Sequence, residues 1–259
     1  MIAGVLKETY PGESRVALVP AHIGSLKKKG FEIYIESGAG LDAGFTDAMY
    51  EAEGASVKDR KEVLSKSDVL LQVRALGTNS SSDKEDAGNL KNGAIVIAVM
   101  DSLTNKGPVE TLASSGAKSF ALELVPRISR AQSMDVLSSQ ANIAGYKAAL
   151  IAADSLPKMF PMMMTAAGTI TPASVLVVGA GVAGLQAIAT CNRLGAVVSA
   201  YDIRPAVKEQ VMSLGAKFVE LELETGEAED KAGTPRPWTK SSTKGKGASG
   251  QGRGRRQTP

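Results

Sequence analysis

The chain has 259 residues, which is enough for two modest domains or one large one. Its apolar content is ordinary and its aromatic side chains are few, so aliphatic residues must build the core. The single cysteine, Cys191, excludes an internal disulfide framework and suits a reducing compartment. The net charge of +3 arises from residues 234–259, which hold seven Lys and Arg and no acid, so the rest of the chain holds 23 bases against 27 acids. A basic folded surface for nucleic acid is therefore not expected, and the first residues lack the pattern of a signal peptide.

Apolar, β-branched runs alternate with helical patterns along the first half of the chain. This alternation predicts a mostly parallel sheet with helices on both faces. The predicted strands cover residues 2–6, 31–35, 69–73, 94–99 and 118–124. The predicted helices cover about residues 20–30, 46–53, 58–66 and 104–116. Residues 77–93 are polar and glycine-bearing, which predicts a surface loop.

A long helix is predicted over residues 135–154, with Ser133 or Asp135 placed to cap or charge its N-terminus. Apolar residues at spacings of four and three predict its buried stripe, which consists of Leu137, Ala141, Ala144, Ala148 and Ile151. Two prolines interrupt residues 155–164, and the methionines there are predicted to fill an irregular junction: Met162, Met163 and Met164.

The pattern that follows predicts a compact βαβαβ unit. Its strands are expected at residues 175–179, 196–202 and 216–221, and its helices at 182–195 and 205–215. This order is one mononucleotide-binding half of a doubly wound fold. The apolar stretch 174–191 resembles a membrane span, but its spaced glycines and β-branched start favour a buried strand, turn and helix.

These elements predict an α/β chain with two Rossmann-like doubly wound domains, the second truncated, followed by a disordered basic tail. The expected divisions are an N-terminal domain, a linking helix with its junction, a truncated nucleotide-binding domain and the tail, at residues 1–137, 138–164, 165–233 and 234–259.

A glycine loop with the sequence GAGVAG lies between the first strand and helix of the βαβαβ unit. Gly179 allows the tight turn, Gly181 lets backbone amides approach a pyrophosphate, and Gly184 permits close packing of the helix. Asp202, at the end of the next strand, is placed to accept hydrogen bonds from an adenosine ribose, which favours NAD(H) over NADP(H). Arg204, two residues later, weakens that preference slightly. The alternative to a nucleotide-binding loop is that the glycines serve packing alone.

The stretch VPRISRAQSMDVLSSQ is an unusually polar connection before the long helix. Arg127 and Arg130 are permanent cations, while Gln132, Asp135 and Ser138 supply donors and acceptors. Such groups suit an amide-bearing ring such as nicotinamide. A solvated connector is the alternative, and composition alone favours it.

Other reactive residue types have simpler interpretations. His22 is expected to pack or to face solvent, and Cys191 is expected in the core rather than as a nucleophile. Glu8 and Arg15 face either a cleft or the surface. No group of Cys and His has the spacing of metal ligands, so no metal is predicted.

Three segments closely resemble the NAD(H)-binding domain of proton-translocating NAD(P) transhydrogenases, in the alpha subunit. They read PRISRAQSMDVLSSQANIAGY, FPMMMTAAGTITPASVLVVGAGVAGLQAIAT and RLGAVVSAYDIRPAVKEQV. A fourth, KETYPGESRVALVP, is similar to the start that this family shares with alanine dehydrogenase. The resemblance covers about residues 1–233, and its first motif is the most specific.

The resemblance implies direct hydride transfer between NADH bound here and NADP+ bound on a separate domain, coupled to proton translocation. It implies a dimeric domain on the cytoplasmic side of the inner membrane, attached through membrane-spanning and NADP(H)-binding partner subunits. No side chain need act as an acid or base, because a hydride moves directly and positioning does the catalytic work.

The resemblance also assigns residues. Arg127, Asp135 and Ser138 would hold the nicotinamide end, and Gln132 would reach toward the NADP(H) nucleotide. The glycine loop would bind the pyrophosphate, and Asp202 the adenosine ribose. Neighbouring residues complete the expected cofactor site: Ile128, Ser129, Ala180, Val182, Ile203 and Arg204.

Alanine dehydrogenase is the alternative within this resemblance. It would use Arg15 for a substrate carboxylate, but it needs a lysine near residue 74 and a histidine near residue 100. This chain has Arg74 and Met100 instead. A non-catalytic nucleotide-binding fragment is a second alternative.

The sequence departs from the family pattern after Gly233. A shift of the reading frame by one nucleotide can turn TPRPWTKSSTKGKG into YAKAMDEEFYKGKG, whose beginning resembles the family's continuation. Residues 234–259 are therefore expected to be a frameshifted product, with a natural basic tail as the alternative. On this interpretation the chain is expected to bind NADH weakly or not at all.

Overall fold

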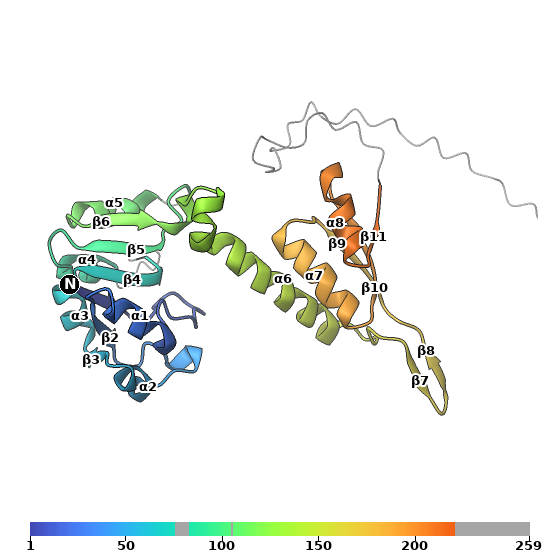
Figure 1. The fold of residues 1–259 in the computed structure, drawn as a ribbon, viewed down its shortest axis with the longest axis horizontal. Coiled ribbons are helices and arrows are strands. Elements are labelled where there is room, and N and C mark those ends of the chain that lie inside the picture. The colour runs from blue at the N-terminus through green and yellow to red at the C-terminus, as the bar shows by residue number, and fades with distance from the viewer. Residues whose placement is uncertain (76–82, 105, 221–259) are drawn as a thin grey trace, which may run out of the picture. The chain divides into compact units, whose positions relative to one another are not determined.

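The computed structural model describes residues 1–75, 83–104 and 106–220 (Figure 1). The chain divides into two compact units, the first ending at Val136 and the second beginning at Leu137. The tail expected at 234–259, and the expected end of the second domain at 221–233, lie outside the described residues.

Unit 1 is built on a six-stranded parallel sheet in the order β3-β2-β1-β4-β5-β6. This is the order of a doubly wound dinucleotide-binding sheet, so the prediction of a Rossmann-like α/β fold is confirmed. The strands are β1 (Ile2–Val5), β2 (Glu32–Glu36), β3 (Ser56–Lys58), β4 (Val69–Arg74), β5 (Ile95–Val99) and β6 (Lys118–Ala121).

The helices of unit 1 are shorter than predicted, and one was missed. The α-helices are α1 (Ile23–Lys27), α2 (Asp47–Ala52), α3 (Arg60–Lys66), α4 (Asp83–Asn89) and α5 (Lys106–Ser114). The 3-10 helices are η1 (Pro20–His22), η2 (Leu41–Ala43), η3 (Leu122–Leu124) and η4 (Ser129–Met134). The prediction of a loop over 77–93 was wrong where α4 lies, and its first part, residues 77–82, lies outside the described residues.

An ion-pair cluster explains why a helix as polar as α4 packs against unit 1. Arg60 of α3 forms a two-pronged pair with Asp86 of α4, at 2.9 Å from Nε and 2.6 Å from Nη2. Its Nη1 also donates to Glu36 at 2.8 Å and to the Lys7 carbonyl at 3.1 Å. Charge pairing therefore holds α4 against unit 1. A helix that packs through an apolar face shows apolar periodicity in its sequence, and α4 was not predicted because it lacks that periodicity.

The sheet of unit 1 separates two apolar cores. Successive residues of a strand point to opposite faces, and Val5 and Leu6 accordingly belong to different clusters. Val5 packs with α1 and α2 residues, including Ile23 and Tyr50, whereas Leu6 packs with α3 and α5 residues. Both faces of the sheet are thus covered, as expected for parallel strands.

Unit 2 contains a three-stranded parallel sheet in the order β11-β10-β9, the 3-2-1 half of the doubly wound order. Its strands are β9 (Ser174–Val178), β10 (Val197–Tyr201) and β11 (Lys217–Phe218), and its helices are α6 (Val136–Ser155), α7 (Val182–Arg193), η5 (Pro205–Val207) and α8 (Lys208–Ser213). The predicted βαβαβ order is confirmed.

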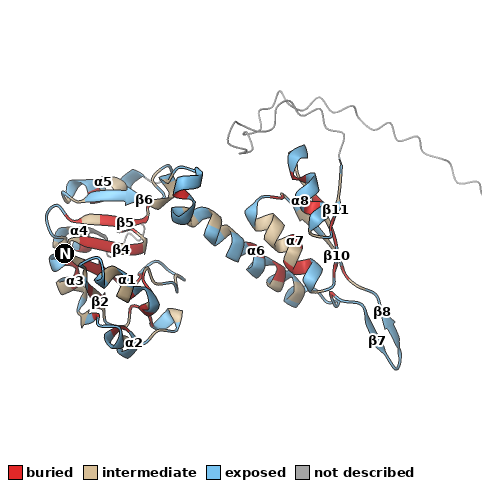
Figure 2. Ribbon diagram, viewed as in Figure 1, coloured by how far each residue is buried: buried red, intermediate tan, exposed pale blue. Residues whose placement is uncertain are grey.

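Only one face of this sheet is well covered in the described part of the chain. Val198 and Ala200 are buried, whereas Leu176, Val178 and Val197 are 61%, 74% and 56% exposed. Parallel sheets normally bury both faces, so this apolar surface is unusual. Figure 2 colours each element by burial and shows the hairpin of the two short strands before this sheet in the colour of exposed residues.

The predicted buried stripe of α6 was wrong. Leu137, Ala144, Ala148 and Ile151 are exposed, and the buried positions of this helix are Gly145 and Ala149. At Gly145 the helix meets the backbone of α7 so closely that no side chain fits, and Ala149 packs in the core of unit 2. The contact face therefore carries small residues, and the larger apolar residues Leu137 and Ile151 are exposed.

The predicted methionine-filled junction was also wrong. Residues 155–164 lead into an antiparallel hairpin of β7 (Met163–Thr165) and β8 (Gly168–Ile170). Met162, Met163 and Met164 are 62%, 43% and 80% exposed, so they fill no interior space.

Candidate functional site

The first glycine of the predicted loop makes a turn that requires glycine. Gly179 follows β9 with a φ of +95°, in the left-handed region where a side chain is strained. Its amide donates to the carbonyl of Tyr201 at 2.7 Å, which ties the end of β9 to the end of β10. The turn therefore places the loop at the carboxyl edge of the sheet, where α/β proteins bind ligands.

The other two glycines differ in their surroundings. A Cβ built on Gly184 would lie 1.8 Å from the carbonyl oxygen of Gly179. The first turn of α7 can therefore pack against Gly179 only because residue 184 is a glycine. A Cβ built on Gly181 would meet nothing within 4 Å. Gly181 is the N-cap of α7, so open space adjoins the helix start, whose amides and dipole favour an anion.

Asp202 lies beside the glycine loop and also forms a hydrogen bond to its backbone. Its Oδ2 accepts a 2.6 Å hydrogen bond from the amide of Ala180, which is buried. Its side chain is only 6% exposed. The sequence pattern predicted that Asp202 binds a ribose. It did not predict the hydrogen bond to the loop amide, because such a bond has no signature in residue spacing.

Arg204 forms an ion pair with the same carboxylate. Its Nε donates to Oδ1 of Asp202 at 3.0 Å and its Nη2 donates to Oδ2 at 3.2 Å. The backbone amide of Arg204 donates to Oδ1 at 2.9 Å. Burial raises the pKa of Asp202, but the hydrogen bonds from Arg204 and Ala180 outweigh it and hold the pKa below its usual value. Asp202 is thus a stable anion.

The long helix α6 supports the start of α7 from another side. A Cβ built on Gly145 would lie 2.1 Å from the carbonyl oxygen of Ala183, the second residue of α7. Gly145 is buried in the middle of α6. An isolated glycine inside a helical pattern is the signal that indicates such a backbone contact. The spacing of the larger apolar residues gives no indication of this contact.

The polar stretch before α6 forms a small cavity of its own within unit 1. The cavity has a volume of about 270 Å³ and is lined by Arg127, Ile128, Ser129, Gln132 and Asp135. Most of these residues belong to η4 or lie beside it, and Asp135 is half-buried directly before α6. The structure therefore brings together five of the residues predicted to bind cofactors, two of which, Arg127 and Asp135, were predicted for the nicotinamide end. Ser138, the third residue predicted for the nicotinamide, follows in the first turn of α6.

The carboxyl edge of unit 1 holds a separate charged cluster. Glu8 is buried and accepts from the amides of Val73 and Arg74 at 2.7 and 3.2 Å. Burial raises the pKa of Glu8. Arg15 donates from Nε and Nη2 to the two oxygens of Glu13, both at 2.7 Å.

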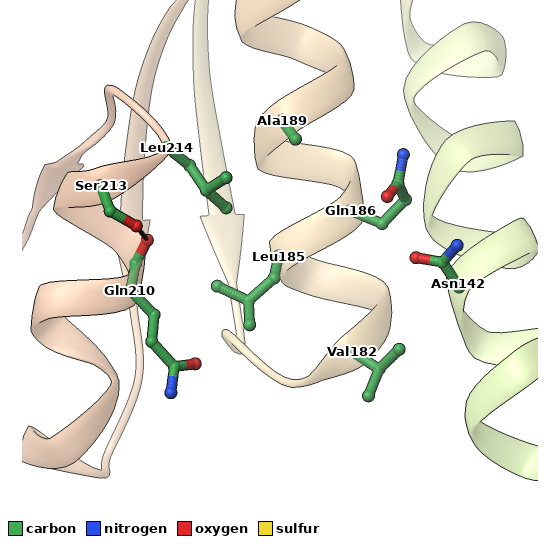
Figure 3. Close-up of a pocket in the computed structure, with 8 residues that line it drawn as sticks. All are labelled: Asn142, Val182, Leu185, Gln186, Ala189, Gln210, Ser213 and Leu214. Carbon is green, nitrogen blue, oxygen red and sulfur yellow. Dashed lines mark hydrogen bonds between the residues drawn. The ribbon is translucent and has the colours of Figure 1, made fainter. Parts of the chain in front are cut away.

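Unit 2 has a cavity of about 400 Å³ along α7, with α6 and α8 on either side (Figure 3). Residues of three helices line it: Asn142, Val182, Leu185, Gln186, Ala189, Gln210, Ser213 and Leu214. Its wall is mostly apolar with amide groups around it, and among the predicted site residues only Val182 contributes.

The structure also places the cysteine and the histidine, and bears on membrane-spanning helices and metal sites. Cys191 is buried in the core of unit 2, as predicted, and burial raises the pKa of its thiol. His22 is exposed at the end of η1. Within residues 1–75, 83–104 and 106–220, no helix is long and apolar enough to cross a membrane. The same residues contain no cluster of His, Cys, Asp and Glu suited to a metal ion.

Together, the sheet order and the glycine loop define an α/β protein of the Rossmann type. The chain matches the alanine dehydrogenase/PNT N-terminal domain over residues 4–144 and the alanine dehydrogenase/PNT C-terminal domain over residues 148–244. The chain belongs to this family.

Comparison with individual proteins points to one branch of the family. The chain is 47% identical over 234 residues to an NAD(P) transhydrogenase alpha subunit protein of Rhodospirillum rubrum, covering 90% of this chain and 61% of that protein. A solved transhydrogenase structure from Sinorhizobium meliloti is 50% identical with a TM-score of 0.81, covering 85% of this chain and 64% of that one. The alanine dehydrogenase of Mycobacterium tuberculosis is 31% identical over 222 residues, covering 84% and 57%. The chain thus spans about three fifths of these relatives and is more similar to the transhydrogenases.

Proposed function

We propose that this chain is the NAD(H)-binding component of a proton-translocating transhydrogenase. The observation that carries the proposal is the glycine loop, with open space at Gly181 and an ionised Asp202 fastened to Ala180. The pyrophosphate of NAD(H) binds at the start of α7, and the adenosine ribose binds beside Asp202. A 2′-phosphate in the same place meets the negative charge of Asp202, which favours NAD(H).

The nicotinamide end is assigned to the cavity beside η4. Arg127 and Asp135 offer opposite charges there, and Gln132 offers both a donor and an acceptor. We assign Arg127, Asp135 and Ser138 to the nicotinamide and its carboxamide, and Gln132 to the NADP(H) nucleotide of a partner. The bound cofactor supplies the hydride, and these residues orient the ring and exclude water.

The remaining parts of the activity need partner subunits. Hydride transfer to NADP+ requires a domain that binds NADP(H), and proton translocation requires membrane-spanning segments. Relatives are named as alpha subunits, which supports an assembly of several chains. We therefore place this chain at the membrane through its partners, as a homodimer on the cytoplasmic side.

Alanine dehydrogenase activity is disfavoured by the ion pair of Arg15 and by the residue type at position 100. Arg15, which that activity would use for the substrate carboxylate, already pairs with both oxygens of Glu13. Met100 is buried where a histidine would be needed, and its amide donates to Glu123. A substrate carboxylate would have to displace Glu13 and would find no acid or base at residue 100.

Two measurements test the proposal. Calorimetric titration with NADH should give a dissociation constant weaker than about 1 μM, and Gly181→Asp, which places a negative charge in the open space, should abolish the binding. Mixing the chain with a separate NADP(H)-binding subunit should give hydride transfer from NADH to an NADP+ analogue. Absence of NADH binding at millimolar concentration, together with absence of transfer, would sink the proposal. Oxidative deamination of alanine would instead favour the dehydrogenase.

A further inference from the structure

The carboxylate of Asp202 is fully engaged before any nucleotide binds. A carboxylate offers about four acceptor positions, two on each oxygen. The amides of Ala180 and Arg204 take one position on each oxygen. The Arg204 guanidinium takes the other two, through Nε on Oδ1 and Nη2 on Oδ2.

The guanidinium occupies the positions that a ribose would need. A ribose 2′,3′-diol presents two neighbouring hydroxyl donors, and its usual carboxylate partner accepts from them. The two amide bonds come from the backbone of the loop and of the strand end, so breaking them would disrupt both. The side chain of Arg204, only 14% exposed, is the partner that can leave by rotation about its own bonds.

We infer that Arg204 competes internally with the adenosine ribose for Asp202, so that nucleotide binding must first displace its guanidinium. This inference rests on the proposed NAD(H) site. The displaced guanidinium remains attached two residues from Asp202, close to the ribose. There it offsets part of the charge with which Asp202 repels a 2′-phosphate. Arg204 thus weakens binding of NAD(H) and narrows the preference for NAD(H) over NADP(H).

Arg204→Ala in the full chain tests the competition. The two acceptor positions become free, so the affinity for NADH and for AMP should rise by about two- to tenfold, the worth of one or two hydrogen bonds that no longer have to be broken. Affinity for 2′-deoxy-AMP, which lacks the diol, should change little. NADPH affinity should stay the same or fall, so the preference for NADH widens.

A matched control separates competition from charge. Arg193, exposed in the last turn of α7, carries the same charge in the same unit. Arg193→Ala should not tighten any of the four nucleotides, because it releases no acceptor of Asp202. Each protein is titrated calorimetrically with NADH, NADPH, AMP and 2′-deoxy-AMP at one ionic strength.

The outcomes distinguish this inference from the proposed function. Tighter binding of NADH and AMP by Arg204→Ala, without tighter binding by Arg193→Ala, supports the competition. If Arg204→Ala bound AMP and 2′-deoxy-AMP more weakly, Arg204 would hold the nucleotide. If the variant bound AMP as the wild-type chain does, there would be no competition. Either result overturns the inference but leaves the proposed nucleotide site intact. If neither protein binds any nucleotide, the proposed site itself fails.

Discussion

Gly145→Ala provides a direct test of how α6 supports the glycine loop. The new Cβ would lie 2.1 Å from the carbonyl oxygen of Ala183, whereas ordinary contacts begin at 3.4 Å, so the two segments must separate by about 1.3 Å. The obstacle is backbone, which places the cost near the upper end of about 1–3 kcal/mol for overpacking. Alanine regains about 1 kcal/mol through helix propensity, which leaves a net loss of about 2 kcal/mol.

Hydrogen exchange measured on peptides from the start of α7 is the suitable assay, because it reports local opening in a chain of two units. A loss of about 2 kcal/mol should speed exchange there by about thirtyfold. Gly107→Ala is the matched control: Gly107 lies in the first turn of α5, and a Cβ built on it meets nothing within 4 Å. If Gly145→Ala exchanged no faster than this control, the proposed backbone contact would not support the loop.

Three further predictions concern the loop, its acid and the cluster that holds α4. Gly184→Ala forces the Gly179 carbonyl away from α7, so NADH affinity should fall by about tenfold or more in calorimetry. The lowered pKa of Asp202 means that its contribution to stability is present above pH 3.8 and is lost as the pH falls through the folded value. In Asp202→Asn the stability of unit 2 should therefore fall less steeply as the pH is lowered, which hydrogen exchange can measure. Arg60→Met leaves the carboxylates of Glu36 and Asp86 unpaired and mostly buried, and should destabilise unit 1 by about 3 kcal/mol in urea unfolding.

Arg60→Met has a control variant, and each of the last two predictions has a result that would contradict it. Arg15→Met removes another ion-paired arginine of unit 1, but its side chain is 45% exposed, so the expected loss is below about 1 kcal/mol. Equal losses for the two arginine variants would contradict the importance of the buried cluster. An acid limb that keeps its full slope in Asp202→Asn would mean that Asp202 is not stabilised in its ionised form.

The main features of the fold followed from local pattern. The β-branched runs gave the strands, and their alternation with helices gave a parallel sheet, because parallel strands need crossover connections. The glycine spacing with Asp202 predicted the loop, and two of its glycines meet a backbone requirement of one short turn: Gly179 through its positive φ and Gly184 through its contact with the Gly179 carbonyl. The segment around η4 stood out because its polar residues are too dense for an ordinary connection.

The features that were missed depend on partners far away in the sequence. α4 is polar and is held by Arg60 from α3, so no apolar period marks it. The buried face of α6 follows from the backbone of α7, which lies about forty residues later and selects glycine over leucine. β3 has three residues, one of them exposed and two half-buried, too few for a pattern.

The hydrogen bond between Ala180 and Asp202 also constrains how cofactor preference can change. Replacing the acid by a residue without a side-chain oxygen, to admit a phosphate at the ribose, removes the acceptor that holds the loop amide. Such a variant would lose loop order together with its old selectivity, and should bind both nucleotides weakly unless a second substitution anchors Ala180. A change of preference in one step therefore has to keep an acceptor oxygen at residue 202 while removing its charge.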